Sequence, residues 1–231
     1  MKISIVIPVF NEVNTVRKVV EKVRNLPFEK EIIIVDDGST DGSREVIKAM
    51  EKEYGNNPNM KFIYHPKNMG KGTAIRSALK LVEGDVVVIQ DADLELNPEE
   101  IPLLLKPILE NNAQVVYGSR FLKPEQRKRS FLRNLANWIL STLASVLYGQ
   151  RITDEATGYK VFRTEILKEL NLKSKGFEFC PEVTAKVLKR GEKIVEVPVS
   201  YDPRTAEEGK KICWKDGFKA VYTLLKYRFV D

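Results

Sequence analysis

Short apolar runs alternate with amphipathic stretches through the first half of the chain. Helices are predicted at about residues 14–26, 42–54 and 70–82, between strands predicted at ISIVIPVF, EIIIVDD, MKFIYH and DVVVIQD. Strands that alternate with helices are typical of parallel βαβ units. Because these runs carry apolar residues on both faces, helices are expected to cover both sides of the sheet. The pattern predicts an α/β fold with a Rossmann-like, mostly parallel central sheet flanked by helices.

The second half of the chain has a less regular pattern. A strand is predicted at about residues 114–119, followed by the basic segment FLKPEQRKRSFLRN with a break at Pro124 and a helix to about Tyr148. A short helix is expected after DEATGYKVFR, a strand at KIVEVPVSY and a helix at the C-terminus. The sequence shows no internal repeat and no linker, so one domain spanning residues 1–231 is predicted.

Polar clusters follow three of the predicted strands. Asn11 and Glu12 follow the first, DDGST follows the second and DADLE follows the fourth. Each cluster alone could be a turn or a helix cap. Three of them at one sheet edge favour a binding site, because ligands of such sheets bind beyond the carboxyl ends of the strands. The three acids of DADLE repel one another unless a cation lies between them, so a cation is predicted there.

Composition narrows the class of protein. The net charge of +6 favours an anionic partner such as a phosphorylated substrate or an acidic membrane surface. Cys180 and Cys213 have no metal-binding or disulfide spacing, so a reducing cytosol is the expected location. The N-terminus lacks the features of a signal peptide. The apolar-leaning stretch 136–148 is shorter than the roughly 20 residues of a membrane span, so no transmembrane helix is predicted.

Two common nucleotide-binding motifs are missing. The first predicted strand runs into VFNEVNT without the glycines of a dinucleotide fingerprint, which disfavours a dehydrogenase. GKGTAI lacks the upstream glycine of a P-loop, which disfavours an ATPase. The diphosphate of a nucleotide would therefore need a divalent cation, for which Asp91 and Asp93 are candidate ligands.

Four segments, IVIPVFNE, VDDGSTDGS, HPKNMGKGTAI and QDADLE, together resemble the inverting family-two nucleotide-sugar glycosyltransferases with the A-type glycosyltransferase fold. GSR, TGYKVFR and GFEF narrow the resemblance to the branch with the dolichyl-phosphate mannose and glucose synthases. The resemblance covers nearly the whole chain. It implies a nucleotide-sugar donor half at about residues 1–95 and an acceptor half at about 96–231.

The resemblance also implies donor-site roles. Asp91 and Asp93 would hold Mg²⁺ or Mn²⁺, and Ala92 would let the donor approach the backbone closely. Glu95 would be a third metal ligand where the relatives usually have Gln, and its extra charge is expected to tighten a hard cation. The remaining predicted donor-binding residues are Pro8, Val9, Phe10 and Glu12 around the base and ribose, Asp37 at the base, Lys71, and Arg204 with Lys210 in a basic loop over the diphosphate.

Arginines characterise the predicted acceptor half. Arg120 and Arg133 match family positions that grip an acceptor phosphate, a role that suits the guanidinium fork. A hydroxyl acceptor would need a general base, whereas a phosphate acceptor arrives ionised. No Glu-Asp pair follows Asp93 that could supply the base, because DE at 154 and 155 has the reverse order. Arg133 and Lys71 could also be solvated surface charges, and His65 is expected to be a polar residue at a strand end.

The predicted reaction transfers a hexose, mannose or glucose, with inversion from a GDP- or UDP-sugar to a polyprenyl (dolichyl) phosphate. Transfer to a saccharide or glycolipid hydroxyl is the alternative reaction. A basic module that binds membrane or nucleic acid is the non-enzyme alternative, although no nucleic-acid-binding motif is present and no nucleic acid is expected as a partner. The basic run 123–133 and the apolar residues after it, with the C-terminal helix, predict peripheral contact with the cytoplasmic face of a membrane. The same helices could instead pack on the sheet or form an oligomer contact.

Overall fold

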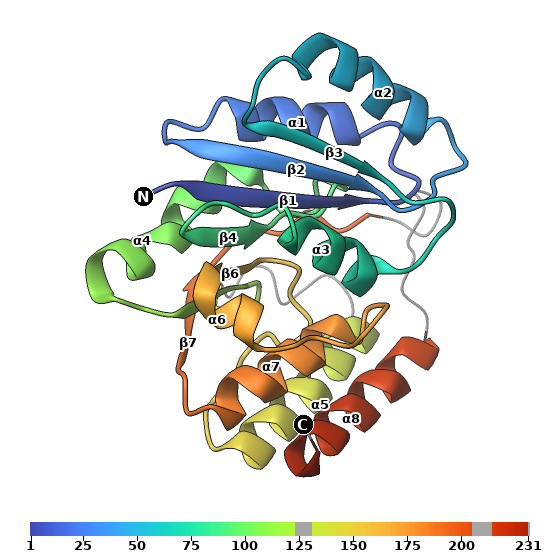
Figure 1. The fold of residues 1–231 in the computed structure, drawn as a ribbon. Helices are drawn as coiled ribbons and strands as arrows, with labels where there is room; N and C mark the ends of the chain where they lie inside the picture. Colours follow the sequence, from blue (N-terminus) through green and yellow to red (C-terminus); the bar gives the residue numbers. More distant parts are fainter. Residues whose placement is uncertain (123–130, 205–213, 231) are drawn as a thin grey trace.

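A seven-stranded sheet with the order β3-β2-β1-β4-β6-β5-β7 runs through the protein (Figure 1). The computed structural model describes residues 1–122, 131–204 and 214–230, without the side chains of 131–133 and 214–215. The strands are β1 (Ile3–Val9), β2 (Lys30–Asp36), β3 (Met60–Tyr64), β4 (Val86–Ile89), β5 (Val115–Ser119), β6 (Lys160–Arg163) and β7 (Ile194–Pro198). The first four strands are mutually parallel, as the alternating pattern predicts.

Helices cover both faces of the sheet (Figure 1). On one face, α1 (Val16–Arg24) buries valines spaced three and four residues apart, the pattern of a helix with one apolar face. The other helices are α2 (Ser43–Tyr54), α3 (Lys71–Leu79), α4 (Ile101–Asn111) after a 3-10 turn at Pro98–Glu100, α5 (Phe131–Tyr148), α6 (Thr164–Glu169), α7 (Phe179–Lys189) and α8 (Trp214–Phe229). None of the described helices combines the length and apolarity that a membrane span needs.

Three apolar clusters define the layers. The first joins α1, α2 and α4 to one face of the sheet, and the second joins α3, α6 and α7 to the other face. A third cluster packs α5 and α8 together over Ala185 of α7. Helices α5 and α8 therefore form an outer layer beyond α7, as the ribbon view shows (Figure 1).

The sequence pattern missed strand β6, and it also gave no expectation for α4 and α7. TGYKVFR was expected only to precede a short helix, but Lys160–Arg163 pairs antiparallel with β4 and β5. Four residues are too few for an alternating pattern to stand out, and this strand forms because two existing strand edges hydrogen-bond to it. Since β6 is antiparallel to β4, the residues just before it lie beside the carboxyl end of β4.

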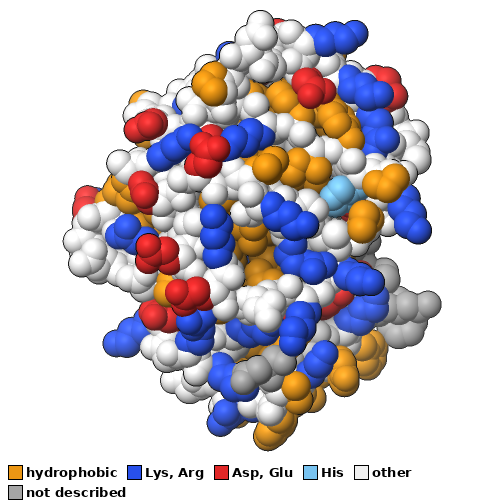
Figure 2. Space-filling model, viewed as in Figure 1, with side chains coloured by type: hydrophobic (Ala, Val, Ile, Leu, Met, Phe, Trp, Pro, Cys, Tyr) orange, Lys and Arg blue, Asp and Glu red, His pale blue; other side chains and the backbone are white. Residues whose placement is uncertain are grey.

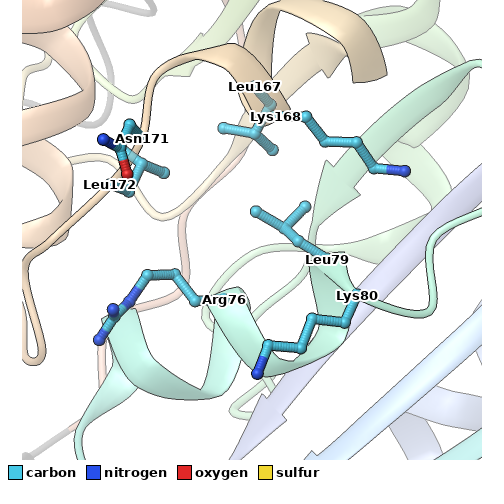
Figure 3. A pocket seen from close by; sticks show the side chains of 7 residues that line it. All are labelled: Arg76, Leu79, Lys80, Leu167, Lys168, Asn171 and Leu172. Carbon is cyan, nitrogen blue, oxygen red and sulfur yellow. The ribbon is translucent and has the colours of Figure 1, made fainter.

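A depression of about 340 Å³ lies between α3 and α6, with Leu79 and Leu167 among its lining residues (Figure 3). Nearby, Thr164 donates a hydrogen bond to the carbonyl of Gly84, and Lys168 donates one to that of Val82. The depression is therefore near the amino end of β4, opposite the polar loops. Its cationic side chains, labelled in Figure 3, point in different directions.

Candidate active site at the carboxyl ends of the strands

The polar loops after β1, β2 and β4 lie together, because these three strands are parallel neighbours in the sheet. The first two loops are hydrogen-bonded to each other. The backbone N–H of Asp37 donates to the carbonyl of Val9 (2.7 Å), and that of Thr40 donates to the side chain of Asn11 (2.8 Å). Among the predicted base-pocket residues Val9 is buried, while Pro8 and Phe10 are half-buried. The convergence predicted for the three strand ends is confirmed.

Asp37 is buried and anchors the loop that leads into α3. Its carboxylate accepts hydrogen bonds from the backbone N–H groups of Met69 (2.9 Å) and Gly70 (2.8 Å) and contacts His65 Nδ1 (2.7 Å). His65 lies directly after β3, as predicted, and its other ring nitrogen contacts Ser77 (3.0 Å). The structure thus gives Asp37 a loop-holding role, and recognition of the base stays a prediction.

Lys71 is paired with the first acid of DADLE. It is the first residue of α3, and its Nζ lies 2.5 Å from Asp91 Oδ1. Only 12% of its side chain is exposed, so Lys71 is not a solvated surface lysine. Burial lowers its pKa, but the charge and hydrogen bond of Asp91, together with Cys180 and Asp93, raise the pKa overall. Lys71 therefore remains a cation beside the predicted donor diphosphate.

A tight turn forms the DADLE loop. Leu94 has a left-handed backbone (φ 60°), and Asp93 Oδ1 accepts a hydrogen bond from the N–H of Glu95 (3.1 Å). Ala92 is buried beneath the turn. Burial and the carboxylates of Asp91 and Glu95 raise the pKa of Asp93 to about 7, although the Arg204 guanidinium opposes the shift. The loop therefore concentrates negative charge that the surrounding residues only partly balance.

Arg204 lies among three carboxylates, although it is far from them in sequence. Its Nη1 lies 2.9 Å from Glu12 Oε2, and its Nη2 lies 3.2 Å from Asp93 Oδ2. Its backbone N–H donates to Glu95 Oε1 (2.9 Å). Arg204 therefore contacts three residues of the strand-end loops, and its role over the donor diphosphate stays a prediction. In this structure, Arg204 and Lys71 supply part of the positive charge that balances the acids of DADLE.

The carboxyl groups fit a divalent cation that binds together with phosphate. Among the described residues, no three His, Cys, Asp or Glu side chains are placed so that they could hold a metal ion by themselves. The carboxylate of Glu95 instead accepts hydrogen bonds from Tyr201 Oη (3.1 Å) and Arg204 N, so its metal role stays a prediction. Mg²⁺ commonly uses only one or two carboxylates plus substrate phosphates. Asp91 and Asp93 supply such oxygens, and Glu12, Asp91, Asp93 and Glu95 outnumber the cations Lys71 and Arg204 by two.

Gly158 is a site residue whose role the sequence did not indicate. A Cβ atom at this position would lie 2.1 Å from Asp91 Oδ2, far inside van der Waals contact. The residue belongs to TGYK, just before β6, and its approach to Asp91 depends on the pairing of β6 with β4. The glycine in TGYKVFR was the available signal, but only the position of β6 shows what it contacts.

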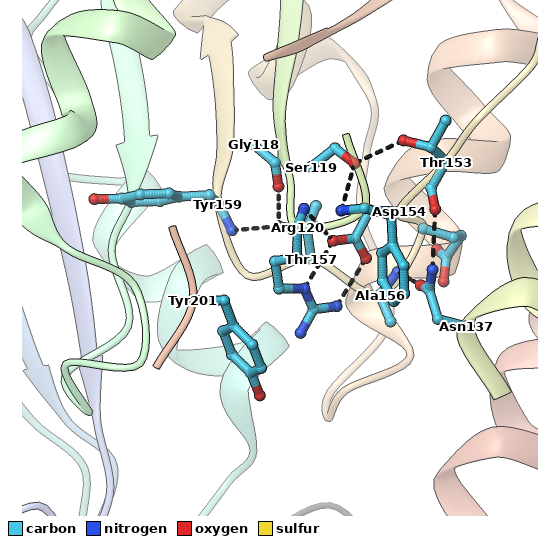
Figure 4. A network of polar contacts seen from close by, with 12 residues as sticks. Gly118, Ser119, Arg120, Asn137, Thr153, Asp154, Ala156, Thr157, Tyr159 and Tyr201 are labelled. Carbon is cyan, nitrogen blue, oxygen red and sulfur yellow. Dashed lines mark hydrogen bonds and ion pairs between the residues drawn. The ribbon is translucent and has the colours of Figure 1, made fainter. Parts of the chain in front are cut away.

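Arg120 is half-buried in a polar network with the buried Asp154 (Figure 4). Its Nε and Nη2 each lie 2.7 Å from an Asp154 oxygen, and its backbone N–H donates to the same carboxylate (2.9 Å). Burial lowers its pKa, but the charge and hydrogen bonds of Asp154, together with Tyr201 and Glu95, raise the pKa overall. Its guanidinium also lies 4.9 Å from the centre of the Tyr201 ring. None of these contacts involves the Nη1 atom of Arg120. Its role in holding an acceptor phosphate stays a prediction.

Helix α5 is tied to the same network (Figure 4). The Asn137 side chain donates to the carbonyl of Thr153 (3.0 Å) and accepts from the N–H of Ala156 (3.2 Å). Arg133 lies in the first turn of α5, but its side chain is outside the described residues, as is all of Lys210. Their predicted contacts with phosphate stay predictions.

Known proteins resemble this chain over nearly its whole length. The model of the Glycosyl transferase family 2 matches residues 4–171. UDP-N-acetylglucosamine–dolichyl-phosphate N-acetylglucosaminyltransferase of Methanococcus voltae is 32% identical over 96% of this chain and 94% of its own length. Undecaprenyl-phosphate mannosyltransferase of Micrococcus luteus is 28% identical over 91% of this chain and 87% of its own length. These relatives fit the predicted polyprenyl-phosphate branch.

The three-dimensional comparison agrees with the predicted fold. Glucosyl-3-phosphoglycerate synthase from Mycobacterium tuberculosis, solved with Mn²⁺, UDP and phosphoglyceric acid, superposes with a TM-score of 0.74 at 22% sequence identity. The match covers 100% of this chain and 79% of that one, which confirms the A-type glycosyltransferase fold. With the family match and the relatives, the chain belongs to glycosyl transferase family 2, and its predicted enzyme class, a glycosyltransferase, is confirmed.

Proposed function

We propose that this protein transfers a hexose, with inversion, from a GDP- or UDP-sugar to a polyprenyl phosphate in a reaction that needs Mg²⁺ or Mn²⁺. The observation that carries the proposal is the pair Asp91 and Asp93 at the strand-end edge, flanked by the cations Lys71 and Arg204. Relatives named for dolichyl-phosphate and undecaprenyl-phosphate sugar transfer support the acceptor. Membership of a glycosyltransferase family sets the non-enzyme alternative aside.

The chemistry is a single in-line displacement at the anomeric carbon of the donor sugar. An acceptor phosphate oxygen forms the new bond as the bond to the donor β-phosphate breaks, and the electron pair leaves with the nucleoside diphosphate. A divalent cation at Asp91 and Asp93 supplies charge neutralisation for that leaving group. Lys71 lies at the same place with 12% of its side chain exposed and adds a fixed positive charge, which is most effective where water is excluded.

The adjacent acids Asp154 and Glu155 of the second half do not offer a free general base. Asp154 is buried and held by Arg120. Glu155 is also buried, which raises its pKa although Lys160 opposes the shift. A phosphate acceptor needs no such base, because it is already ionised. This favours a lipid phosphate over a saccharide hydroxyl, and Nη1 of Arg120 is a donor available for it.

Calorimetry and a transfer assay test the proposed function. We expect one nucleotide sugar among GDP-mannose, UDP-glucose and UDP-N-acetylglucosamine to bind with Mn²⁺ or Mg²⁺ and to lose binding in EDTA, because the diphosphate charge is then unbalanced. The bound donor should transfer its sugar to a polyprenyl phosphate and not to the corresponding polyprenol. Transfer to the polyprenol or to a saccharide hydroxyl alone would replace the proposed acceptor.

We further propose that helices α5 and α8 hold the enzyme against the cytoplasmic face of a membrane. Four apolar side chains of α8 are exposed at spacings of four, three and four residues, namely Phe218, Tyr222, Leu225 and Phe229. They form one stripe, opposite the positions Ala220, Leu224 and Tyr227 that pack on the protein. Lys219 and Lys226 are exposed beside the stripe, and Figure 2 shows hydrophobic and basic side chains together over this region.

Helix α5 presents a second apolar stripe. Its exposed residues Leu135, Trp138, Ile139 and Val146 lie away from the buried Leu140 and Ala144. No charged residue occurs between 134 and 148. Aromatic and aliphatic residues beside lysines are typical of helices that lie in a lipid interface, and the net charge of +6 favours anionic lipid. A lipid surface therefore suits both stripes and also presents the proposed acceptor.

Vesicle binding checks the membrane contact. Phe218→Gln and Phe229→Gln are each expected to weaken binding to phosphatidylglycerol vesicles about tenfold, because a buried Phe contributes about 1.5–3 kcal/mol when fully removed from water. Leu109→Gln on α4 removes an exposed apolar residue elsewhere and should leave binding unchanged. If the wild-type protein floats free of vesicles at low salt yet glycosylates a lipid acceptor, the membrane proposal is wrong. A stable dimer that both Phe variants dissociate would assign the stripe to a second copy instead.

A further inference from the structure

Arg204 joins the loops after β1 and β4 to the segment 199–204 that follows β7, together with Tyr201 and Asp202. It lies 192 positions from Glu12 and 111 from Asp93, and it contacts both carboxylates with its side chain. Two further bonds support it: its backbone N–H donates to Glu95, and the neighbouring Asp202 N–H donates to the Glu95 carbonyl (2.9 Å). Only 17% of the Arg204 side chain is exposed. This is an organised contact of the folded protein, not a loosely held surface arginine.

The Arg204 guanidinium contacts a carboxylate that the proposed cation also needs. Nη2 lies 3.2 Å from Asp93 Oδ2, and Asp93 is one of the two residues proposed to hold Mg²⁺ or Mn²⁺. Two positive charges close to the same carboxylate repel each other, and the repulsion is strong where water is scarce. A cation that arrives alone must therefore displace the guanidinium from Asp93 or bind beside it at an electrostatic cost.

A nucleoside diphosphate changes that balance. Its oxygens bring negative charge to the same place and offer the guanidinium a bidentate partner of the kind that Arg binds best. Arg204 then gains a partner in exchange for Asp93, and the cation gains phosphate ligands. The free energy lost by displacing Arg204 is recovered only when both ligands are present.

We infer that Arg204 couples the two ligands: it occupies the cation site in the free enzyme, so that the divalent cation and the nucleoside diphosphate bind tightly only together. The inference rests on the proposed function, because it takes the cation and the nucleotide from there. Coupling of this kind is reciprocal, so the nucleotide should also bind weakly without the cation. The consequence is an enzyme that does not bind the free metal in the absence of its donor.

Mn²⁺ binding to wild-type protein and to Arg204→Gln, followed by electron paramagnetic resonance, tests the inference without an activity assay. We expect Arg204→Gln to bind Mn²⁺ alone about 5- to 150-fold more tightly than wild type, the usual range of such coupling. The gain in Mn²⁺ affinity on adding UDP or GDP should shrink correspondingly. Mn²⁺ alone should also raise the melting temperature of Arg204→Gln more than that of wild type.

Two further variants control for charge and folding. Arg190→Gln removes an equal charge from a surface pair with Glu169 at the end of α7, so its Mn²⁺ affinity should match wild type. Arg204→Lys keeps the charge but lacks the fork that spans two carboxylates, so its affinity for Mn²⁺ alone should fall between wild type and Arg204→Gln. If Arg204→Gln does not fold, the affinity of Arg204→Lys for Mn²⁺ alone decides whether Arg204 weakens metal binding in the free enzyme.

The outcomes separate the inference from the proposed function. If wild type binds Mn²⁺ with UDP or GDP, but both Arg204 variants bind Mn²⁺ alone no more tightly than wild type, the coupling role is wrong and the proposed function stands. If wild type binds Mn²⁺ neither alone nor with either nucleotide, the metal part of the proposed function fails and the inference fails with it. Tight Mn²⁺ binding to wild type without nucleotide would overturn the inference alone.

Discussion

Replacement of Asp91 by asparagine is expected to lower kcat/KM for sugar transfer at least about 1,000-fold. The substitution removes a proposed cation ligand and leaves the half-buried Lys71 ammonium without the carboxylate 2.5 Å away. Charge stabilisation by a bound cation is worth several kcal/mol, and about 1.4 kcal/mol corresponds to a factor of ten in rate. Steady-state transfer kinetics measure the loss, and Mn²⁺ titration in the presence of nucleotide should show it as lost binding.

Asp85→Asn is the matched control for Asp91→Asn. Asp85 is exposed just before the opposite end of β4, where its carboxylate accepts a hydrogen bond from the N–H of Lys2 (2.8 Å). The same chemical change there should leave kcat/KM within a few fold of wild type. Thermal unfolding of Asp91→Asn separates lost catalysis from lost folding. Activity within tenfold of wild type in a folded Asp91→Asn protein would contradict the assignment of Asp91 as a cation ligand.

The second large effect is expected from Gly158→Ala, about a 100-fold loss of kcat/KM. The new methyl group would lie 2.1 Å from Asp91 Oδ2, so the carboxylate must move. Displacement of a catalytic group by about 1 Å commonly costs about 100-fold in rate. The affinity for Mn²⁺ in the presence of nucleotide should fall as well, because the absence of a side chain at Gly158 leaves room for the Asp91 carboxylate.

Gly217→Ala in α8 provides the comparison for this glycine. Among the described residues, no atom lies within 4 Å of a Cβ built at Gly217, so the methyl group clashes with none of them. Alanine is favoured over glycine inside a helix by about 1 kcal/mol, and unchanged activity with equal or higher stability is expected. A Gly158→Ala enzyme with wild-type kinetics and metal affinity would show that Asp91 tolerates a shift, contrary to the proposed constraint.

Much of the candidate site could be located from local sequence features. The polar residues after β1, β2 and β4 follow apolar runs, and parallel strands bring their carboxyl ends to one edge. The resemblance carried over Arg204 as a residue near the donor, and its contact with Asp93 agrees with that placement. The sequence did not indicate that the carboxylates of Asp37 and Glu95 already accept hydrogen bonds within the protein. Their donors, Gly70 and Tyr201, belong to segments distant in sequence.

By itself, the sequence determined the type of sheet, the edge at which polar residues gather and the family, because periodicity and motifs are local properties of the chain. Only the tertiary structure decided which charges pair. Lys71 meets Asp91 across 20 positions and Arg204 meets Asp93 across 111, contacts that no local pattern encodes. Strand β6 shows the same limit: a four-residue segment becomes a strand, and brings Gly158 to Asp91, because the edges of β4 and β5 supply its hydrogen bonds. Pairing of this kind depends on the free energy of the assembled sheet, which sums contacts between segments far apart in the chain.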